Sequence, residues 1–152
     1  MDVMKCFIER GADVNVQSEI GWTPLIHASV MGFEKKVNLL LSSDSINLDV
    51  QDARGWTALM WATDKGAMLK LGNASTHYED IVDALIQKGA DLDLQNHQGT
   101  TALMWAADCG HLNITRSLVA AGANVHLKDS VGQTALSVSL TMATKLQEKK
   151  GI

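Results

Sequence analysis

A five-residue phrase built around glycine, threonine and leucine recurs four times in this chain. It reads Gly-Trp-Thr-Pro-Leu from Gly21, Gly-Trp-Thr-Ala-Leu from Gly55, Gly-Thr-Thr-Ala-Leu from Gly99 and Gly-Gln-Thr-Ala-Leu from Gly132. The successive glycines lie 34, 44 and 33 residues apart. Periods of this length are typical of solenoids, in which one supersecondary unit is stacked on the next and buries its apolar face there.

Two further phrases lie between the copies of the first and predict the shape of one unit. The threonine of each copy is predicted to cap the start of a helix, and Pro24 follows at a position where a missing N–H costs nothing. Gly32, Gly66 and Gly110 are predicted to end that helix. A second helix is predicted from apolar pairs one turn apart, as in Val37 with Leu40, and a polar, turn-rich stretch then forms a projecting hairpin finger. The exit from the second helix reads Gly-Ala-Asp-Val-Asn, Gly-Ala-Asp-Leu-Asp and Gly-Ala-Asn-Val-His in three units.

These phrases together resemble the ankyrin repeat, which runs near Asp-x-x-Gly-x-Thr-Pro-Leu-His-x-Ala-Ala, then Gly-His, then Gly-Ala-Asp-Val-Asn. The resemblance covers almost the whole chain and implies an all-α repeat fold. The architecture that the resemblance implies is an ankyrin-repeat solenoid of helix-turn-helix units with projecting β-hairpin or loop fingers. We expect a single domain over 1–152, consisting of a partial repeat 1–17, repeats 18–51, 52–95 and 96–128, and a C-terminal capping or partial repeat 129–152. The partial first repeat, with its apolar Val3, Phe7 and Ile8, suggests a fragment of a longer array.

The chain departs from the family pattern in two ways that affect the predictions. Repeat 52–95 carries 11 extra residues, which we place at about 67–79. They form a wall of the binding groove, a tolerated surface insertion or an extended helix, and the sequence leaves these alternatives open. The histidine that the family has after its leucine is absent, and the hydrogen bond that it makes between repeats is expected to be lost. The residues at this position are Ile26, Met60, Met104 and Ser137.

Composition and charge exclude several classes of function. Hydrophobic residues make up 46% and charged residues 20% of the chain, and the net charge is −4. We therefore expect no binding to nucleic acid or to an anionic membrane, both of which require a basic face. Cys6 and Cys109 are expected to be reduced, in an intracellular protein of the cytoplasm or nucleus. No catalytic triad or phosphate loop is recognisable, and Cys109 with His111 lacks a second ligand pair, so we expect no enzyme activity, no cofactor and no metal site.

Family knowledge implies a concave groove made by the fingertips and the first helices of the units. All four tryptophans fall at positions predicted to face this groove, and none at positions predicted to face the core. Because tryptophan is enriched at binding hot spots, the groove is predicted to bind a protein or peptide. The candidate partner-binding residues are Trp22, Trp56, Trp61, Trp105, Asp64, Asp108, Ile20, Arg54, His27, Met31 and His97.

Three interpretations of this groove remain open. The first is a general protein–protein interaction module, and the acidic chain is compatible with a basic partner. The second is a reader of methylated lysine on histone tails, because Trp56, Trp61, Asp64 and Trp105 resemble the methyl-lysine pocket in the ankyrin domains of euchromatic histone methyltransferases. The third is a regulatory segment of a larger enzyme. Against any ligand role, the tryptophans can simply stiffen the stack by packing against the next finger.

Overall fold

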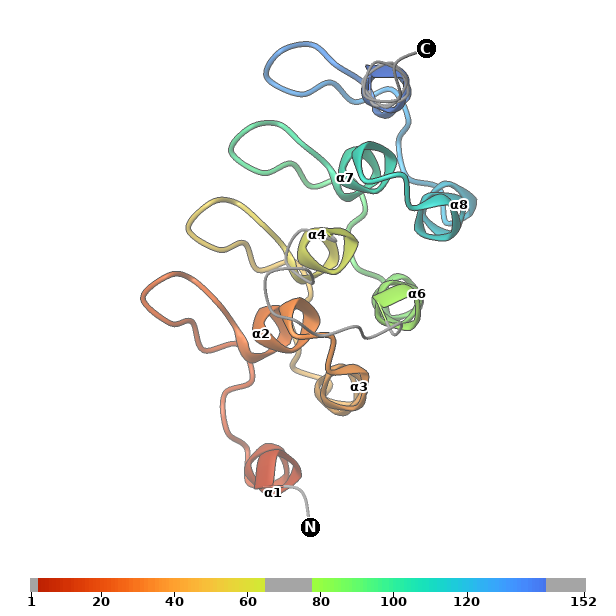
Figure 1. Cartoon of the computed structure of the whole chain (residues 1–152). Coiled ribbons are helices and arrows are strands. Elements are labelled where there is room, and N and C mark those ends of the chain that lie inside the picture. Colours follow the sequence, from red (N-terminus) through yellow and green to blue (C-terminus); the bar gives the residue numbers. More distant parts are fainter. Residues whose placement is uncertain (1–2, 65–77, 142–152) are drawn as a thin grey trace.

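The fold is a stack of helix pairs with loops projecting from one side (Figure 1). The computed structural model describes residues 3–64 and 78–141. An inner column contains α2, α4, α7 and the helical residues 135–141, and an outer column contains α1, α3, α6 and α8 (Figure 1). The helix bounds are Val3–Glu9 (α1), Pro24–Val30 (α2), Glu34–Leu41 (α3), Ala58–Thr63 (α4), Tyr78–Lys88 (α6), Ala102–Asp108 (α7) and Leu112–Ala120 (α8). The all-α repeat prediction is confirmed, and the described fingers are loops without strands.

Each inner helix begins where the repeated threonine predicts. The hydroxyl oxygens of Thr23, Thr57 and Thr101 each accept a hydrogen bond at 3.2 Å from the backbone N–H three residues later. Pro24 occupies the first turn of α2. These caps satisfy N–H groups that a helix start leaves without an intrahelical acceptor.

Each finger is closed by a side-chain oxygen at its base. Asp52 Oδ1 accepts from the backbone N–H groups of Arg54 and Trp56 at 2.8 and 2.9 Å. Asn96 and Asp129 make the same pair of bonds two and four residues ahead. Asp52 and Asp129 are thus hairpin residues whose carboxylates bind backbone N–H groups of the finger. The loops are therefore ordered by specific bonds although they lack strand pairing.

Neighbouring fingers touch along their length. Three backbone bonds join them in series: Ala53 N–H to Ile20 O, His97 N–H to Arg54 O and Ser130 N–H to Gln98 O, at 2.9 to 3.2 Å. Gly99 lies at this contact with φ +74°, and a Cβ placed on it would lie 2.9 Å from Ser130 N. Only glycine permits both the left-handed backbone and this close approach.

A row of glutamines at the finger bases links the repeats a second time. Gln51 Nε2 donates to Gly55 O of its own finger at 2.7 Å and to Gln95 O of the next repeat at 3.0 Å. Gln17 and Gln95 make the equivalent pairs of bonds. The sequence analysis missed these residues, since a glutamine beside a turn looks like an ordinary surface side chain. The fingers thus form a connected layer.

The core lies between the two columns of helices and is apolar where the family has a histidine. Ile26, Met60 and Met104 are almost fully buried, so hydrophobic contact replaces the absent hydrogen bond at these positions. The other large, fully buried side chains include Leu25, Leu40, Leu59, Ile81, Leu85 and Leu118. None of the described helices is long and apolar enough to span a membrane.

The predicted insertion at 67–79 lies mostly outside the described residues, which resume at residue 78. Tyr78 and Glu79, at the end of the predicted insertion, are the first two residues of α6. Tyr78 is buried, and its hydroxyl donates to Val30 O at 2.9 Å. Its ring also lies against Gly32, which has no side chain to obstruct it. This contact fixes the start of α6 against the end of α2.

Candidate functional site

The four tryptophans form one continuous aromatic row over three repeats. Trp22 and Trp56 come from fingers, while Trp61 and Trp105 come from α4 and α7. The ring centroids of Trp61 lie 5.5 Å from Trp22 and 4.7 Å from Trp56, and Trp56 lies 4.7 Å from Trp105. His27 of α2 extends the row, at 6.1 Å from Trp22. Each tryptophan on an inner helix therefore packs against the finger of the preceding repeat, Trp61 against Trp22 and Trp105 against Trp56.

Burial differs along this row. Trp56 and Trp61 are each only 7% exposed and belong to the hydrophobic core, whereas Trp22 and Trp105 are half-buried. The prediction that no tryptophan lies in the core is thus wrong for Trp56 and Trp61. The physical reason is that the indole of Trp61 lies between two adjacent fingers, which cover it from both sides. Trp22 and Trp105 are the members of the row with indole surface left for a partner.

A cation of the chain itself already lies on the two buried indoles. The Arg54 guanidinium carbon is 4.6 Å from the Trp61 ring centroid and 5.3 Å from that of Trp56. The Trp61 indole N–H donates to Asp52 Oδ2 at 3.0 Å. Asp64, the acid expected beside this group, directly follows α4 as its C-cap residue. Trp56 and Trp61 are thus brought together as the resemblance implies, with Arg54 over them.

The other predicted residues lie on the fingers or on the inner helices and their ends. Ile20, Arg54 and His97 are exposed finger residues. His27 is exposed on α2. Met31 and Asp108 are half-buried at the C-terminal ends of α2 and α7.

Two hollows flank Trp105, and it is the residue that they share besides Gln98. The first has a volume of about 370 Å³ and is lined by Ala53, Arg54, Trp56, Asn96, His97, Gln98 and Trp105. The second has a volume of about 160 Å³ and is lined by Gln98, Thr100, Met104, Trp105, Asp108, Asp129, Gln133 and Val138. Gln98 and Gln133 lie at positions that the repeat pattern predicts to face the groove, whereas Asn96 was not predicted to do so. Their signal is positional only, since each lies next to a finger turn.

Comparison with protein families identifies the stack. A family model for ankyrin repeats, comprising three copies, matches residues 1–71 and 71–145. The chain belongs to the ankyrin-repeat family. Ankyrin repeats generally mediate protein–protein interactions and are generally not catalytic. The phrases that carry the resemblance are also the ones that cap the helices and close the fingers here.

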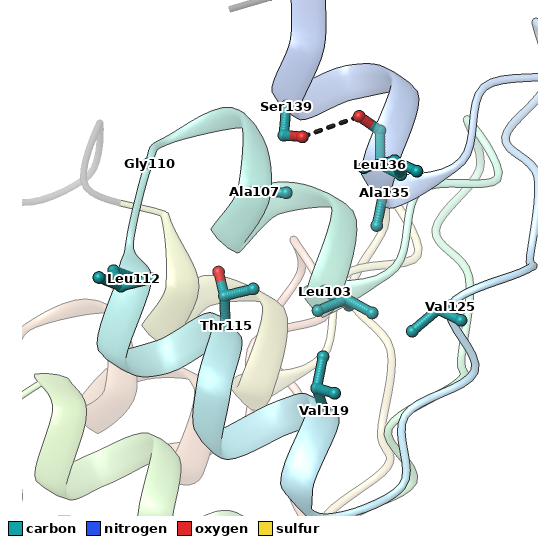
Figure 2. A pocket seen from close by; sticks show the side chains of 10 residues that line it. All are labelled: Leu103, Ala107, Gly110, Leu112, Thr115, Val119, Val125, Ala135, Leu136 and Ser139. Atoms are coloured by element: carbon teal, nitrogen blue, oxygen red, sulfur yellow. Dashed lines mark hydrogen bonds between the residues drawn. The ribbon is translucent and has the colours of Figure 1, made fainter. Parts of the chain in front are cut away.

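A separate apolar cavity lies at the end of the ankyrin stack. It has a volume of about 370 Å³ and lies between α7, α8 and residues 135–141. Figure 2 shows Leu103, Val119 and Val125 around its floor, with Ala135 and Leu136 above them. Nothing in the described residues shows what covers it.

Metal-ligating side chains do not gather in the described part of this ankyrin domain. Within residues 3–64 and 78–141, no three His, Cys, Asp or Glu side chains are placed to bind one metal ion. Neither cysteine of this part, Cys6 or Cys109, forms a disulfide. The aromatic and polar side chains around Trp105 form the candidate functional site of this domain.

Proposed function

We propose that this chain is a non-catalytic protein–protein interaction module that binds a peptide or protein on its finger face. By finger face we mean the surface made by the fingers and the inner helices α2, α4 and α7. The observation that carries this proposal is the end of the aromatic row at Trp105, which lines two hollows on that face. A half-buried indole between two hollows gives a partner apolar contact area at low conformational-entropy cost.

The surroundings of Trp105 suit a binding hot spot. Polar side chains surround the indole, among them Gln98, Asp108 and Gln133. Hot spots combine an aromatic anchor with a polar rim that excludes water around it. The finger-to-finger hydrogen bonds also hold the face in one arrangement, so a partner would not have to order the loops on binding.

The methyl-lysine alternative has less support than general peptide binding. A methylammonium group seeks a desolvated aromatic face, and the Arg54 guanidinium already lies against Trp56 and Trp61. A methylated lysine would have to displace Arg54 or use Trp105 alone. The third interpretation, a regulatory segment of a larger enzyme, depends on a catalytic domain outside these residues. The closeness of Trp56, Trp61 and Trp105 agrees with the methyl-lysine alternative, but Arg54 occupies the place that the methylated lysine would need.

Selection of binding peptides with matched charge-reversal variants tests the proposed function. Peptides are selected from a random phage-displayed library on the wild-type domain, and their affinities are measured by tryptophan fluorescence. Arg54→Glu and His97→Glu alter the exposed fingers, while Arg116→Glu and Lys88→Glu alter exposed positions at the outer helices. We expect the finger variants to weaken binding about tenfold or more and the outer variants to leave it unchanged.

Two outcomes contradict the proposal. One is selected peptides that bind all four variants as they bind the wild-type domain. The other is binding lost only in the outer variants. Histone-tail peptides with unmethylated and dimethylated lysine form a further arm, in which tight binding of the methylated peptide alone would favour the reader instead.

A further inference from the structure

Two neighbouring repeats each place a finger-base Asp or Asn nine residues before an inner-helix tryptophan. Asp52 precedes Trp61 by nine residues, and its Oδ2 accepts the Trp61 indole N–H. Asn96 precedes Trp105 by the same nine residues. Asn96 Oδ1 accepts from the backbone N–H groups of Gln98 and Thr100, each at 2.9 Å, as Asp52 Oδ1 does in its own finger. These two bonds fix the orientation of the Asn96 amide. Its Nδ2 therefore takes the place that Oδ2, the acceptor of the Trp61 N–H, has in Asp52.

The exchange of an oxygen for an NH2 group leaves two donors without an acceptor. Asn96 Nδ2 and Trp105 Nε1 are both buried, and neither has a hydrogen-bond partner within the described part of the chain. Asn96 is only 5% exposed. Buried donors are nearly always paired in folded proteins, and unpaired ones at a hollow indicate a missing acceptor. The equivalent donor of the preceding repeat, on Trp61, is satisfied.

The larger hollow flanking Trp105 is rich in donors and contains no acid. Asn96 and Trp105 line it together with Arg54, His97 and Gln98, and no Asp or Glu is among its lining residues. Arg54 contacts the indoles of Trp56 and Trp61, and within the described residues it forms no ion pair. The smaller hollow beyond Trp105 is different, since Asp108 and Asp129 line it. Only the larger one offers a guanidinium and unpaired N–H groups together, which is the donor set that a carboxylate prefers.

We propose that this hollow binds the carboxylate of an Asp or Glu side chain presented by the peptide or protein partner. Because both nitrogens have almost no exposed surface in the unbound domain, the carboxylate would reach them only after a small movement of the Trp105 indole away from Asn96. It would then accept from Asn96 Nδ2 and Trp105 Nε1 and lie within reach of the Arg54 charge. This inference rests on the proposed function and specifies the partner's chemistry at one point of the finger face. It assigns an acidic group there, although the net charge of −4 is also compatible with a basic partner.

Indole N–H signals in NMR test the proposal directly. The 15N-labelled domain is titrated at constant ionic strength with N-acetyl-glutamate N-methylamide and, separately, with its glutamine counterpart. The Trp105 signal is identified by its loss in Trp105→Phe. We expect it to shift saturably with the glutamate compound and about tenfold more weakly with the glutamine compound. The Trp61 signal should stay in place because Asp52 already accepts from it.

Asn96→Asp and Asp52→Asn form the matched pair of variants. Asn96→Asp supplies the missing carboxylate from the chain itself, so it should abolish the Trp105 response while raising the melting temperature. Asp52→Asn should lower the melting temperature and leave the Trp105 response unchanged. Loss of binding together with a gain in stability cannot result from unfolding.

The proposal is overturned if the two compounds bind equally, if neither shifts Trp105 saturably, or if Asn96→Asp keeps the wild-type response. Its failure differs from failure of the proposed function. If the selected peptides contain no acidic residue and still lose binding in the finger variants, the carboxylate site is wrong and the interaction module holds. If Trp105 responds to the glutamate compound but no selected peptide loses binding in the finger variants, the carboxylate site holds and the interaction module is wrong.

Discussion

Single side chains decide how each repeat closes its finger. Asp52, Asn96 and Asp129 occupy equivalent positions, and all three accept from two backbone N–H groups. The other terminal atom of the side chain differs. In Asp52 and Asp129 it is a second carboxylate oxygen, which can accept another hydrogen bond, whereas in Asn96 it is a nitrogen, which can only donate. At Asp52 that oxygen binds an inner-helix indole. The same backbone geometry can thus coexist with a satisfied or an unsatisfied core donor.

The first prediction concerns the effect of the Asp or Asn at the finger base on the free energy of unfolding. Asn96→Asp is expected to raise the free energy of unfolding by about 1 to 2 kcal/mol, because it gives the buried Trp105 indole an acceptor. Asp52→Asn is expected to lower it by a similar amount, because it removes the acceptor of Trp61. Urea denaturation monitored by circular dichroism measures both. A loss of stability in both variants would show that position 96 gains nothing from a carboxylate.

The second prediction concerns Tyr78, the only tyrosine of the chain. Burial raises the pKa of its phenol above the ordinary value of 10.0. The folded state therefore keeps the proton at a pH where the unfolded state loses it. The resulting stabilisation is complete below pH 10 and is lost as the pH rises through the folded-state pKa. Tyrosinate absorbance near 295 nm should thus appear later in the native protein than in urea.

Tyr78→Phe is the control for this pH dependence. It removes the titrating group and the hydrogen bond to Val30 O, so it should cost about 1 kcal/mol at neutral pH. Above pH 10 its stability should fall less steeply than that of the wild-type domain. Equal slopes would mean that other groups, not Tyr78, govern the alkaline loss of stability.

Among the structural elements, the fingers depend most on their neighbours. Each finger lacks strand pairing and is joined to the next by one backbone bond at its tip and a glutamine at its base. The tip bond requires that the two loops approach closely, which the glycine in each finger permits. The last finger, with Gly132, has no following finger among the described residues, and a Cβ on Gly132 would meet no atom within 4 Å.

The third prediction uses this contrast between equivalent glycines. Gly99 and Gly132 have φ values of +74° and +83°, so alanine at either position pays a similar backbone cost of about 1 to 2 kcal/mol. Gly99→Ala should cost about 1 to 3 kcal/mol more, because its methyl group would collide with the backbone of the next finger at Ser130. Thermal or urea denaturation of the two variants measures the difference. Equal losses would show that the fingers separate without cost.

At the scale of the whole molecule, the fold could be predicted from the repeated spacing. The site was harder to predict, because it depends on what surrounds each side chain. The equivalent threonines and glycines indicate where helices begin and loops turn, since each position recurs at a nearly constant period. The burial of Trp56 and Trp61 could not be predicted in this way. A column of positions tells which way a side chain faces, but not that the adjacent finger covers it. The glutamine bridges and the unpaired donors at Asn96 depend on single atoms of neighbouring repeats, which no spacing reveals.

The last prediction concerns how stability is distributed along the stack. In a repeat protein each unit contacts only its neighbours, so interior units are stabilised from two sides and terminal ones from one. All six residues of α4 are buried, whereas α1 has no buried residue and residues 135–141 contain only Ala135. We expect the backbone amides of α4 to exchange with deuterium at least about tenfold more slowly than those of α1 and of residues 135–141.

Hydrogen exchange followed by mass spectrometry, with Gly99→Ala as a comparison, checks this distribution. If the repeats unfold in units, the variant should speed exchange in the repeats on either side of its finger and leave α2 and α3 nearly as protected as before. Exchange accelerated equally everywhere would instead mean that the stack opens as one cooperative body. In that case the aromatic row, which connects α2 to α7 through four indoles, would be the natural source of the coupling. Trp61→Phe, which keeps an apolar ring but removes the N–H bonded to Asp52, would then test how much of that coupling the hydrogen bond supplies.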